Sequence, residues 1–402
     1  MAERRVPRIR FKGFEEDWEQ RKLGEIFEES NERSSEMDIL SVSVNNGIYP
    51  ASESDRDVNP GASLENYKIV HKGDIVYNSM RMWQGAVGES VYDGIVSPAY
   101  VVVRAKQEVD SRYFGYLLKR PEMLYKYLCY SQGNSKDTQT LRYERFAEIE
   151  ARISIEVTEQ QMISRCIGKI DSLFSLHQRK LEKLKILKKA MLEKMFPKNG
   201  AKVPEIRFSG FTDDWEQRKL GEHAVYRRGS FPQPYGRKEW YDGEGAMPFV
   251  QVIDVTDNMK LADDTKQKIS KLAQPMSVYA EKGQVLVTLQ GSIGRVAVAQ
   301  YGTFVDRTVL VFEKYKTRTD TDFWAYVVKQ KFIDEARRAP GGTIKTITKE
   351  ALSEFDILLP KYEEQVRIGE FLKRIDHLIT LHQRKLEKLR QIKTSMLERM
   401  FV

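Results

Sequence analysis

The feature that most constrains this chain is an internal duplication. The segment 7–25 reads PRIRFKGFEEDWEQRKLGE and the segment 204–222 reads PEIRFSGFTDDWEQRKLGE, with 15 of 19 positions identical. A second pair of segments, 177–196 and 382–401, matches at 14 of 20 positions. The two pairs are offset by 197 and 205 residues, so both halves run in the same order: entry motif, intervening domain, long helical segment. Such a repeat predicts two copies of one structural unit.

The intervening segments have diverged but keep a common apolar frame. The run 72–78 (KGDIVYN) resembles 282–288 (KGQVLVT), and 114–119 (FGYLLK) parallels 324–329 (WAYVVK). Glycine turns followed by β-branched runs predict strands, and the aromatic runs predict short helices. We therefore expect two mixed α/β (α+β) domains, in agreement with a length of 402 residues, which one core rarely serves.

The polar residues carried on this frame differ between the halves. Ser97-Pro98-Ala99-Tyr100 stands where the second half has Asp306-Arg307-Thr308-Val309. Two copies of one scaffold with different surface chemistry indicate two different ligands of one class. Neutral drift after duplication is the alternative, but the entry motifs and helical segments have not drifted in the same way.

The helical segments carry a long heptad pattern. Apolar positions, with one histidine in each copy, recur at steps of four and three through 163–195 and 368–400, with one step of seven in each copy. A helix of this length spans roughly 50 Å. Antiparallel pairing of the two would place the domains at opposite ends of a rod, so that a DNA duplex would be touched at places about 15 base pairs apart. The alternatives are that each helix packs on its own domain or that the seams join two chains.

These patterns predict an ordered set of segments. A first recognition domain (1–157) is followed by a spacer helix (158–196), a linker (197–203), a second recognition domain (204–362) and a second spacer helix (363–402). His177 and His382 fall within the seam at matching positions. A polar residue that sets the register of a coiled coil is the simpler interpretation, and a zinc or catalytic role is the alternative.

Candidate DNA-contacting residues come from polar loops at equivalent places in the two halves. Reading base edges requires paired donors and acceptors, together with apolar groups for thymine methyls. In the first half the candidates are Asn45, Asn46, Asn78, Ser79, Arg81, Trp83, Gln84, Tyr100, Asn134 and Lys136. In the second half they are Arg227, Arg228, Ser230, Gln233, Tyr235, Arg237, Gln290, Ser292, Arg307, Thr343 and Lys345.

Several kinds of chemistry leave no signature in this sequence. It contains no G-x-x-x-x-G-K-[ST] phosphate loop, no H-E-x-x-H and no Asn-Pro-Pro-aromatic or Asp-Pro-Pro-aromatic tetrapeptide of an amino-methyltransferase. Five histidines and two cysteines leave little for a metal site. We therefore expect no catalytic residues and no metal in this chain.

The bulk properties are compatible with a polyanionic partner. The net charge is +8, with 41% hydrophobic and 31% charged residues. No apolar run is long enough to span a bilayer, no signal peptide is apparent, and the unpaired cysteine usage suits a reducing compartment. A cytoplasmic protein is expected.

The ordered motifs of the two halves resemble those of a known family. The order W-E-Q-R-K-L-G-E, variable domain, Glu-Gln (159–160 and 364–365) and I-D-x-L-x-x-x-H-Q-R-K-L-E-x-L is similar to the specificity subunit of type I restriction-modification systems. The resemblance covers both halves. At one loop the first half has Gly133-Asn134-Ser135 where the second has Gly341-Gly342-Thr343, and this difference weakens a shared role for that loop.

The resemblance implies two target-recognition domains that each read one half of a split, asymmetric DNA site. They would be separated by an antiparallel two-helix coiled coil within a pseudo-twofold repeat. It also implies partners: double-stranded DNA, two methyltransferase (modification) subunits and up to two restriction endonuclease/translocase subunits. S-adenosylmethionine, ATP and Mg²⁺ would bind to those partners and not to this chain.

Two other functions remain open on sequence grounds. One is a non-catalytic coiled-coil scaffold that binds proteins, and the other is an enzyme with an unrecognised nuclease site. Only a specificity subunit would direct a methyltransferase to a discrete bipartite sequence, and only a nuclease would cleave DNA alone with a divalent metal.

Overall fold

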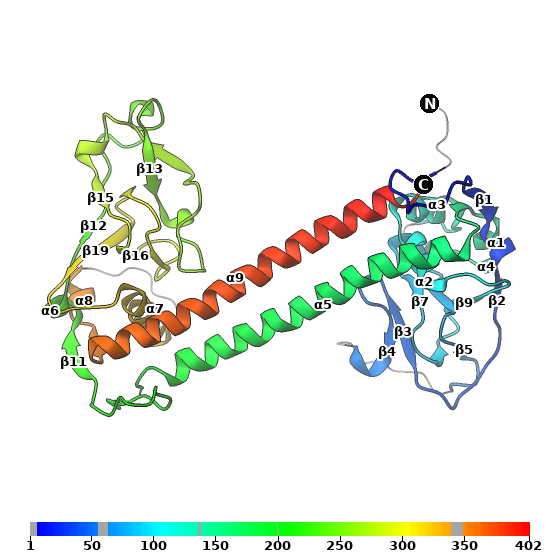
Figure 1. Ribbon diagram of the computed structural model, residues 1–402, viewed down its shortest axis with the longest axis horizontal. Helices are drawn as coiled ribbons and strands as arrows, with labels where there is room; N and C mark the ends of the chain where they lie inside the picture. The colour runs from blue at the N-terminus through cyan, green and yellow to red at the C-terminus, as the bar shows by residue number, and fades with distance from the viewer. Residues whose placement is uncertain (1–5, 55–62, 136–137, 199, 339–348) are drawn as a thin grey trace. The chain divides into compact units, whose positions relative to one another are not determined.

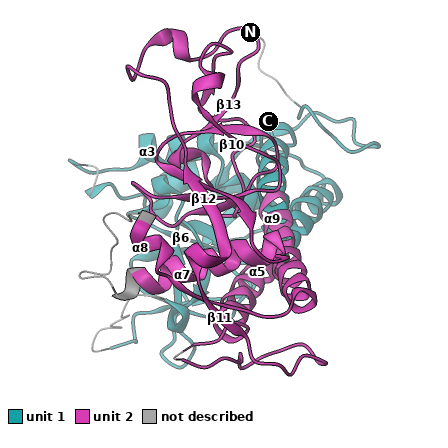
Figure 2. Ribbon diagram, turned by 90° about the vertical axis from the view of Figure 1, so that its left-hand side faces the viewer, with its two compact units in different colours: residues 1–177, 385–402 teal, residues 178–384 magenta. Residues whose placement is uncertain are grey.

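The computed structural model describes residues 6–54, 63–135, 138–198, 200–338 and 349–402. They form two compact units, 1–177 with 385–402 and 178–384, which Figure 2 shows in different colours. Both boundaries fall inside the two long helices, so each unit holds one α/β domain and a part of each helix. The borders of these units fall within the long helices, whereas the segments expected from the sequence end where the helices begin or end. The expected segment borders therefore stay a prediction.

The first unit is built on a four-stranded antiparallel sheet of order β2-β9-β6-β7. Alternate residues face its two sides, as a period of two requires. Tyr77 and Val103 enter a core with Phe114, whereas Val76 and Val102 face a smaller cluster. Its elements are β1 (Glu19–Lys22), α1 (Leu23–Ile26), β2 (Phe27–Glu29), β3 (Leu40–Ser43), β4 (Gly47–Pro50), β5 (Lys68–Val70), β6 (Ile75–Asn78), β7 (Val87–Glu89), β8 (Gly94–Val96), β9 (Tyr100–Ala105), α2 (Ser111–Leu117), α3 (Pro121–Tyr130), α4 (Tyr143–Glu148) and β10 (Glu150–Ile153).

The second unit repeats this sheet with the order β12-β19-β16-β17. It differs in a further four-stranded sheet, β14-β13-β18-β15, whereas the first unit has the two-stranded sheets β3-β4 and β5-β8. The elements are β11 (Glu216–Lys219), α6 (Leu220–His223), β12 (Ala224–Arg228), β13 (Met247–Val250), β14 (Gln267–Ile269), β15 (Val278–Ala280), β16 (Val285–Thr288), β17 (Val296–Val298), β18 (Thr303–Val305), β19 (Val309–Tyr315), α7 (Thr321–Arg338), α8 (Lys349–Ser353) and β20 (Asp356–Leu359).

The shared frame read from the sequence is thus confirmed. The strands expected at 72–78 and 282–288 are β6 and β16, and the helices expected near 114 and 324 are α2 and α7. One detail differs, because α7 has 18 residues and α2 only seven. The sequence 329–338 continues α7 with good helix formers, whereas Pro121 begins a separate helix after α2.

The entry motifs join the start of each long helix. β1 pairs with β10 and β11 with β20, both antiparallel and in matching register. Arg10 forms a bidentate pair with Glu159 at 2.7 and 3.0 Å, and Arg207 does the same with Glu364 at 2.7 Å. Both glutamates are buried. A buried carboxylate needs such compensation, which explains why these residues recur in both halves.

The two long helices, α5 (Val157–Lys194) and α9 (Tyr362–Arg399), have 38 residues each. In the first unit Asp171 pairs with Lys393 at 2.5 Å, and the backbone nitrogen of Ile9 donates to the carbonyl of Arg399, beside the Arg10–Glu159 pair. The start of α5 therefore lies near the end of α9, and the two segments run antiparallel (Figure 1).

The second unit shows the same pairing with the helices exchanged. Lys188 pairs with Asp376 at 2.5 Å, and the backbone nitrogen of Ile206 donates to the carbonyl of Lys194, beside the pair of Arg207 with Glu364. The end of α5 therefore lies near the start of α9. The expected antiparallel helix pair is confirmed, and the alternative of two separate helices, each packed only on its own domain, is wrong.

The heptad seam lies on the buried side of both helices. Ile167 and Leu372 are fully buried, and Leu181 retains only 9% exposure. The last seam residues, Met195 and Met400, lie just beyond the helix ends and pack into the domain cores. Among the described residues, the structure contains no helix long and apolar enough to cross a membrane.

Candidate nucleic-acid interface

In the first unit, three candidate loops meet at one end of the main sheet. Asn78 ends β6 and lies opposite Tyr100, which begins β9. Ser79 donates from its backbone nitrogen (3.3 Å) and its Oγ (2.9 Å) to the carbonyl of Ala99. The backbone nitrogen of Leu141 donates to the carbonyl of Ser79 at 2.8 Å. The loops 78–86 and 97–100 and the described residues of the segment 131–141 thus form one surface.

The β3–β4 turn, which carries Asn45 and Asn46, approaches the same end. A Cβ built on Gly88 would lie 3.6 Å from the Cα of Gly47, so the turn and the start of β7 are in close contact. Both asparagines are exposed, as are Arg81, Gln84 and Asn134. This end of the unit therefore presents amide and guanidinium groups with complementary donors and acceptors.

Other candidates of the first half shape the loops more than they line the surface. The Oδ1 of Asn78 accepts the backbone nitrogen of Met80 at 3.0 Å, which closes the turn. Trp83 packs against the main core, and its Nε1 is buried without a hydrogen-bond partner among the described residues. Tyr100 is half-buried against the small cluster around Val102.

The second unit brings together the equivalent loops. The backbone nitrogen of Gly229 donates to the carbonyl of Val309, and that of Leu289 donates to Thr308, both at 2.8 Å. The loop after β12, the loop after β16 and the segment that leads into β19 therefore meet. The exposed candidates on them are Arg227, Arg228, Gln233, Tyr235, Arg237, Gln290, Ser292 and Arg307.

An aromatic and cationic cluster orders part of this surface. The guanidinium of Arg307 lies 4.8 Å from the ring centroid of Phe231, which in turn lies 4.5 Å from the ring of Tyr235. The Nε of Arg228 donates to the carbonyl of Arg307 at 3.2 Å. Tyr235 remains 59% exposed. The cluster presents an aromatic face and cationic groups to solvent.

Three of the second-half candidates, two of them among the exposed ones, have partners within the unit. Arg227 pairs with Glu313 at 2.5 Å, and Arg237 pairs with Glu239 at 3.1 Å. Ser230 is structural, because its Oγ donates to the carbonyl of Met276 and accepts the nitrogen of Val278. Lys136, Thr343 and Lys345 lie outside the described residues.

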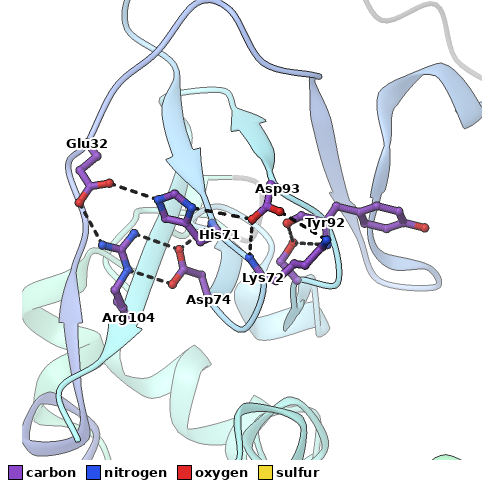
Figure 3. Close-up of polar contacts among 8 residues, drawn as sticks. Glu32, His71, Lys72, Asp74, Tyr92, Asp93 and Arg104 are labelled. Atoms are coloured by element: carbon purple, nitrogen blue, oxygen red, sulfur yellow. Dashed lines mark hydrogen bonds and ion pairs between the residues drawn. The ribbon is translucent and has the colours of Figure 1, made fainter.

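A polar cluster in the first unit lies at the opposite end of the same sheet, where β6 begins (Figure 3). Buried Asp74 accepts both the backbone nitrogen of His71 (2.9 Å) and the guanidinium of Arg104 (3.1 and 3.3 Å). Arg104 also binds Glu32 and lowers the pKa of that carboxyl. These contacts order the 71–74 turn, away from the loops described above.

One repeated arrangement was missed by the sequence reasoning. The phenol of Tyr116 donates to Asp171 at 2.8 Å, and that of Tyr326 donates to Asp376 at 2.5 Å. Both aspartates belong to the repeated I-D-x-L motif, and each is also paired with a lysine of the opposite long helix. The motif was noticed, but its tyrosine and lysine partners are distant in the sequence.

The described residues contain no cluster of histidine, cysteine, aspartate or glutamate that could hold a metal ion. What they contain is a repeated α/β domain with variable loops at one sheet end and an antiparallel helix pair. This combination defines a class of protein that presents two different loop surfaces on one scaffold.

The comparisons with known proteins give the family. Residues 15–186 and 212–391 match the type I restriction modification DNA specificity domain, which is most of the chain, and the chain belongs to this family. It is a specificity subunit, which recognises the DNA target for a type I restriction-modification complex. Both that function and the expectation of a non-catalytic chain are confirmed, because subunits of this kind direct the complex and do not carry its catalytic sites.

Two relatives and one solved structure agree over nearly the whole chain. The putative type I restriction enzyme MjaX specificity subunit of Methanocaldococcus jannaschii is 23% identical over 414 residues, with 94% of each chain covered. The MjaVIII specificity subunit of the same organism is 22% identical, covering 94% of this chain and 90% of the relative. The crystal structure of a type I restriction-modification S subunit from M. genitalium has a TM-score of 0.64 at 14% identity and covers 99% of each chain, which supports the fold.

Proposed function

We propose that each unit reads one half of a bipartite, asymmetric DNA site with the loops at the end of its main sheet. The observation that supports this most strongly is the convergence, in both units, of exposed polar loops on the same end of an equivalent sheet. The scaffold is repeated while the side chains on it differ, so the two half-sites should differ too.

The two surfaces favour different base chemistry. The first presents the amides of Asn46, Gln84 and Asn134 together with Arg81. Amides pair with the N6 and N7 edge of adenine, whereas arginine pairs with O6 and N7 of guanine. The second surface is richer in arginine. We expect adenine contacts in the first half-site and guanine contacts in the second.

The long helices are proposed to set the gap between the half-sites. Within each unit the helix pair is held by an ion pair and by the buried seam, which would keep the spacing constant. A fixed length of paired helix corresponds to a fixed number of base pairs along a duplex.

The helices also carry a repeated apolar surface that suits the docking of two modification subunits. Leu173 and Leu176 on α5 are 46% and 38% exposed, and Leu378 and Leu381 on α9 are 41% and 37% exposed. The two pairs are related by the same 205-residue offset as the helices, and within each pair the spacing of three puts both side chains on one helix face. Two copies of one surface favour two copies of one partner.

The surroundings of the α9 leucines favour an amphipathic element of that partner. A surface groove of about 550 Å³ beside them is lined by Glu370, Lys373, Arg374, His377 and Leu378. The cofactors would then belong to the partners: S-adenosylmethionine on two methyltransferase subunits, and ATP with Mg²⁺ on up to two restriction subunits. The DNA partner also supports the expectation of a cytoplasmic protein.

The decisive experiment combines the purified chain with its methyltransferase subunit, S-adenosylmethionine and a library of duplexes. The proposal expects methylation at one split sequence with a constant gap, and none without this chain. Methylation at scattered sites would contradict it and favour the scaffold alternative. DNA cleavage by this chain alone with a divalent metal would establish a nuclease instead.

Docking is tested by mass measurement of the assembled complex. The variant L173S/L176S should lose one methyltransferase subunit and keep the other, and L173S/L176S/L378S/L381S should lose both. Leu272→Ser is a matched control, because Leu272 is 62% exposed but does not lie on a long helix. Unchanged stoichiometry in the fourfold variant would place the docking surface elsewhere.

A further inference from the structure

The junction between each domain and the helix pair contains more basic side chains than carboxylates. In the first unit Asp171 is shared by the phenol of Tyr116 and the ammonium of Lys393. Lys119 follows Tyr116 by three residues, and the pKa of its amine is lowered by desolvation and by the nearby Lys393. One aspartate therefore faces two lysines.

The second unit repeats this arrangement with residues from the other helix. Asp376 binds Tyr326 and Lys188, and Lys329 follows Tyr326 by the same three residues. Desolvation and Lys188 lower the pKa of the Lys329 amine. Each junction thus keeps a surplus lysine, although the two domains have diverged in their loops.

The neighbouring charges do not remove this surplus. In the second unit Asp257 also lies near Lys329, but its carboxylate is paired with Arg295 at 3.2 Å. In the first unit the nearby carboxyl of Glu89 is matched by Arg112. An amine that is partly desolvated and not neutralised is a favourable place for an anion.

Both surplus lysines border the loops that form the candidate reading surfaces. The Nζ of Lys119 would lie 3.4 Å from a Cβ built on Gly47, next to Asn46 in the β3–β4 turn. The Nζ of Lys329 donates to the carbonyl of Asp257 at 3.3 Å, and Asp257 holds Arg295. The backbone nitrogen of Arg295 in turn donates to the Oγ1 of Thr288, at the base of the 288–292 loop.

We propose that Lys119 and Lys329 bind DNA phosphates and fix each recognition domain on the duplex backbone, without regard to sequence. This inference rests on the proposed reading of DNA by the neighbouring loops. The argument is that bases differ between half-sites but the phosphate backbone does not. A contact to bases should therefore differ between the two halves, whereas a contact to phosphate should be repeated, as these lysines are.

The test uses the assembled methyltransferase complex with the variant K119Q/K329Q. Binding to the target duplex and to a scrambled duplex is measured by fluorescence anisotropy over a series of salt concentrations. Affinity should fall by a similar factor on both duplexes, and the slope of log K against log salt should decrease by about one for each lysine. A slope equal to that of the wild type, or a loss confined to the target duplex, would overturn the inference.

The matched control is K106Q/K316Q. These exposed lysines occupy equivalent positions after β9 and β19, at the opposite end of each main sheet, and their removal changes the net charge by the same amount. Their loss should leave the slope close to the wild-type value. An equal decrease in the control would show a general charge effect and would count against a specific contact.

The variant K119R/K329R keeps both positive charges and therefore distinguishes phosphate binding from a role of these lysines in folding alone. Return of the wild-type salt slope in this variant supports phosphate binding, and a slope that stays low refutes it, even where the glutamine variant lowers the unfolding midpoint. The wild-type complex distinguishes the two proposals. Failure to discriminate target from scrambled duplex would contradict the reading function itself, whereas discrimination with an unchanged slope in K119Q/K329Q would contradict only this inference.

Discussion

The phenol of Tyr326 donates a hydrogen bond to the carboxylate of Asp376 at 2.5 Å, which joins α7 of the second domain to α9. The same carboxylate accepts Lys188 of α5 at 2.5 Å. One acid therefore connects the recognition domain to both long helices. The first unit has the same arrangement through Tyr116, Asp171 and Lys393, so in each unit one half-buried carboxylate contacts the domain and both long helices.

Removal of this hydrogen bond should destabilise the second unit. Tyr326→Phe keeps the ring but leaves Asp376 with one donor fewer, at a cost of about 1.5 to 3 kcal/mol for a hydrogen bond to a charged group. Urea unfolding of the purified chain measures this difference. Tyr125→Phe, at a tyrosine that is 70% exposed, is the control and should have little effect. Equal stability of both variants would show that the bond contributes nothing measurable.

The stability of the second unit should decrease in mild acid because of His223. This side chain is fully buried against Trp324, and its Nε2 contacts the Oγ1 of Thr319 at 3.0 Å. Burial lowers the pKa of His223 from 6.5 to about 4, with a smaller effect of Arg218. Between these values the unfolded chain binds a proton and the folded chain does not, so stability present above pH 6.5 is lost as the pH falls towards 4, by at most about 3 kcal/mol.

The repeat supplies the matched variant for this test, because the first half has Ile26 at the equivalent position. His223→Ile should flatten the dependence of the unfolding free energy on pH between 4 and 6.5, relative to the wild type. Carboxyl groups that titrate in this pH range are present in both proteins, so their contributions cancel in the difference between the two curves. Parallel curves for the two proteins would exclude His223 as the titrating group.

Exchange of one domain should change one half of the target only. Replacing residues 204–362 by the corresponding domain of another specificity subunit keeps the first reading surface, both long helices and Asp376. Sequencing of methylated sites should then show a new second half-site, with the first half-site and the gap retained. A change in both half-sites would contradict independent reading by the two units.

The helices and the repeated frame could be predicted from sequence because their signals are local. The seam recurs at steps of three and four, and the antiparallel pairing followed from two equal seams in one chain. The strand order could not be predicted in this way, because β9 lies between β2 and β6, which precede it in the chain. Such pairing depends on contacts that are distant in the sequence.

The candidate site could be predicted from the sequence only in part, for the same reason. The loops around Arg81 and Gln290 were identified by polarity and by their equivalent positions. Polarity alone did not distinguish Trp83, which packs against the core, from a residue that faces solvent. The junction lysines were missed because Lys119 and Lys393 meet only in the folded chain.

Shortening both helices by one heptad should shorten the gap in the target by about 3 base pairs, since seven residues correspond to roughly 10 Å. Deletion of 177–183 from α5 and 382–388 from α9 removes matched segments and leaves the ion pairs of Asp171 and Asp376 intact. Because a whole heptad is removed from each helix, the remaining seam residues keep their register.

The measurement is the gap between methylated half-sites, with both half-site sequences expected to be unchanged. Deletion of 177–183 alone is the control: it leaves one helix a heptad longer than the other, so the ion pairs at the two junctions cannot both form, and the variant should lose stability and methylation. A shortened pair that still methylates sites with the original gap would show that the spacing is set by the partner subunits and not by α5 and α9.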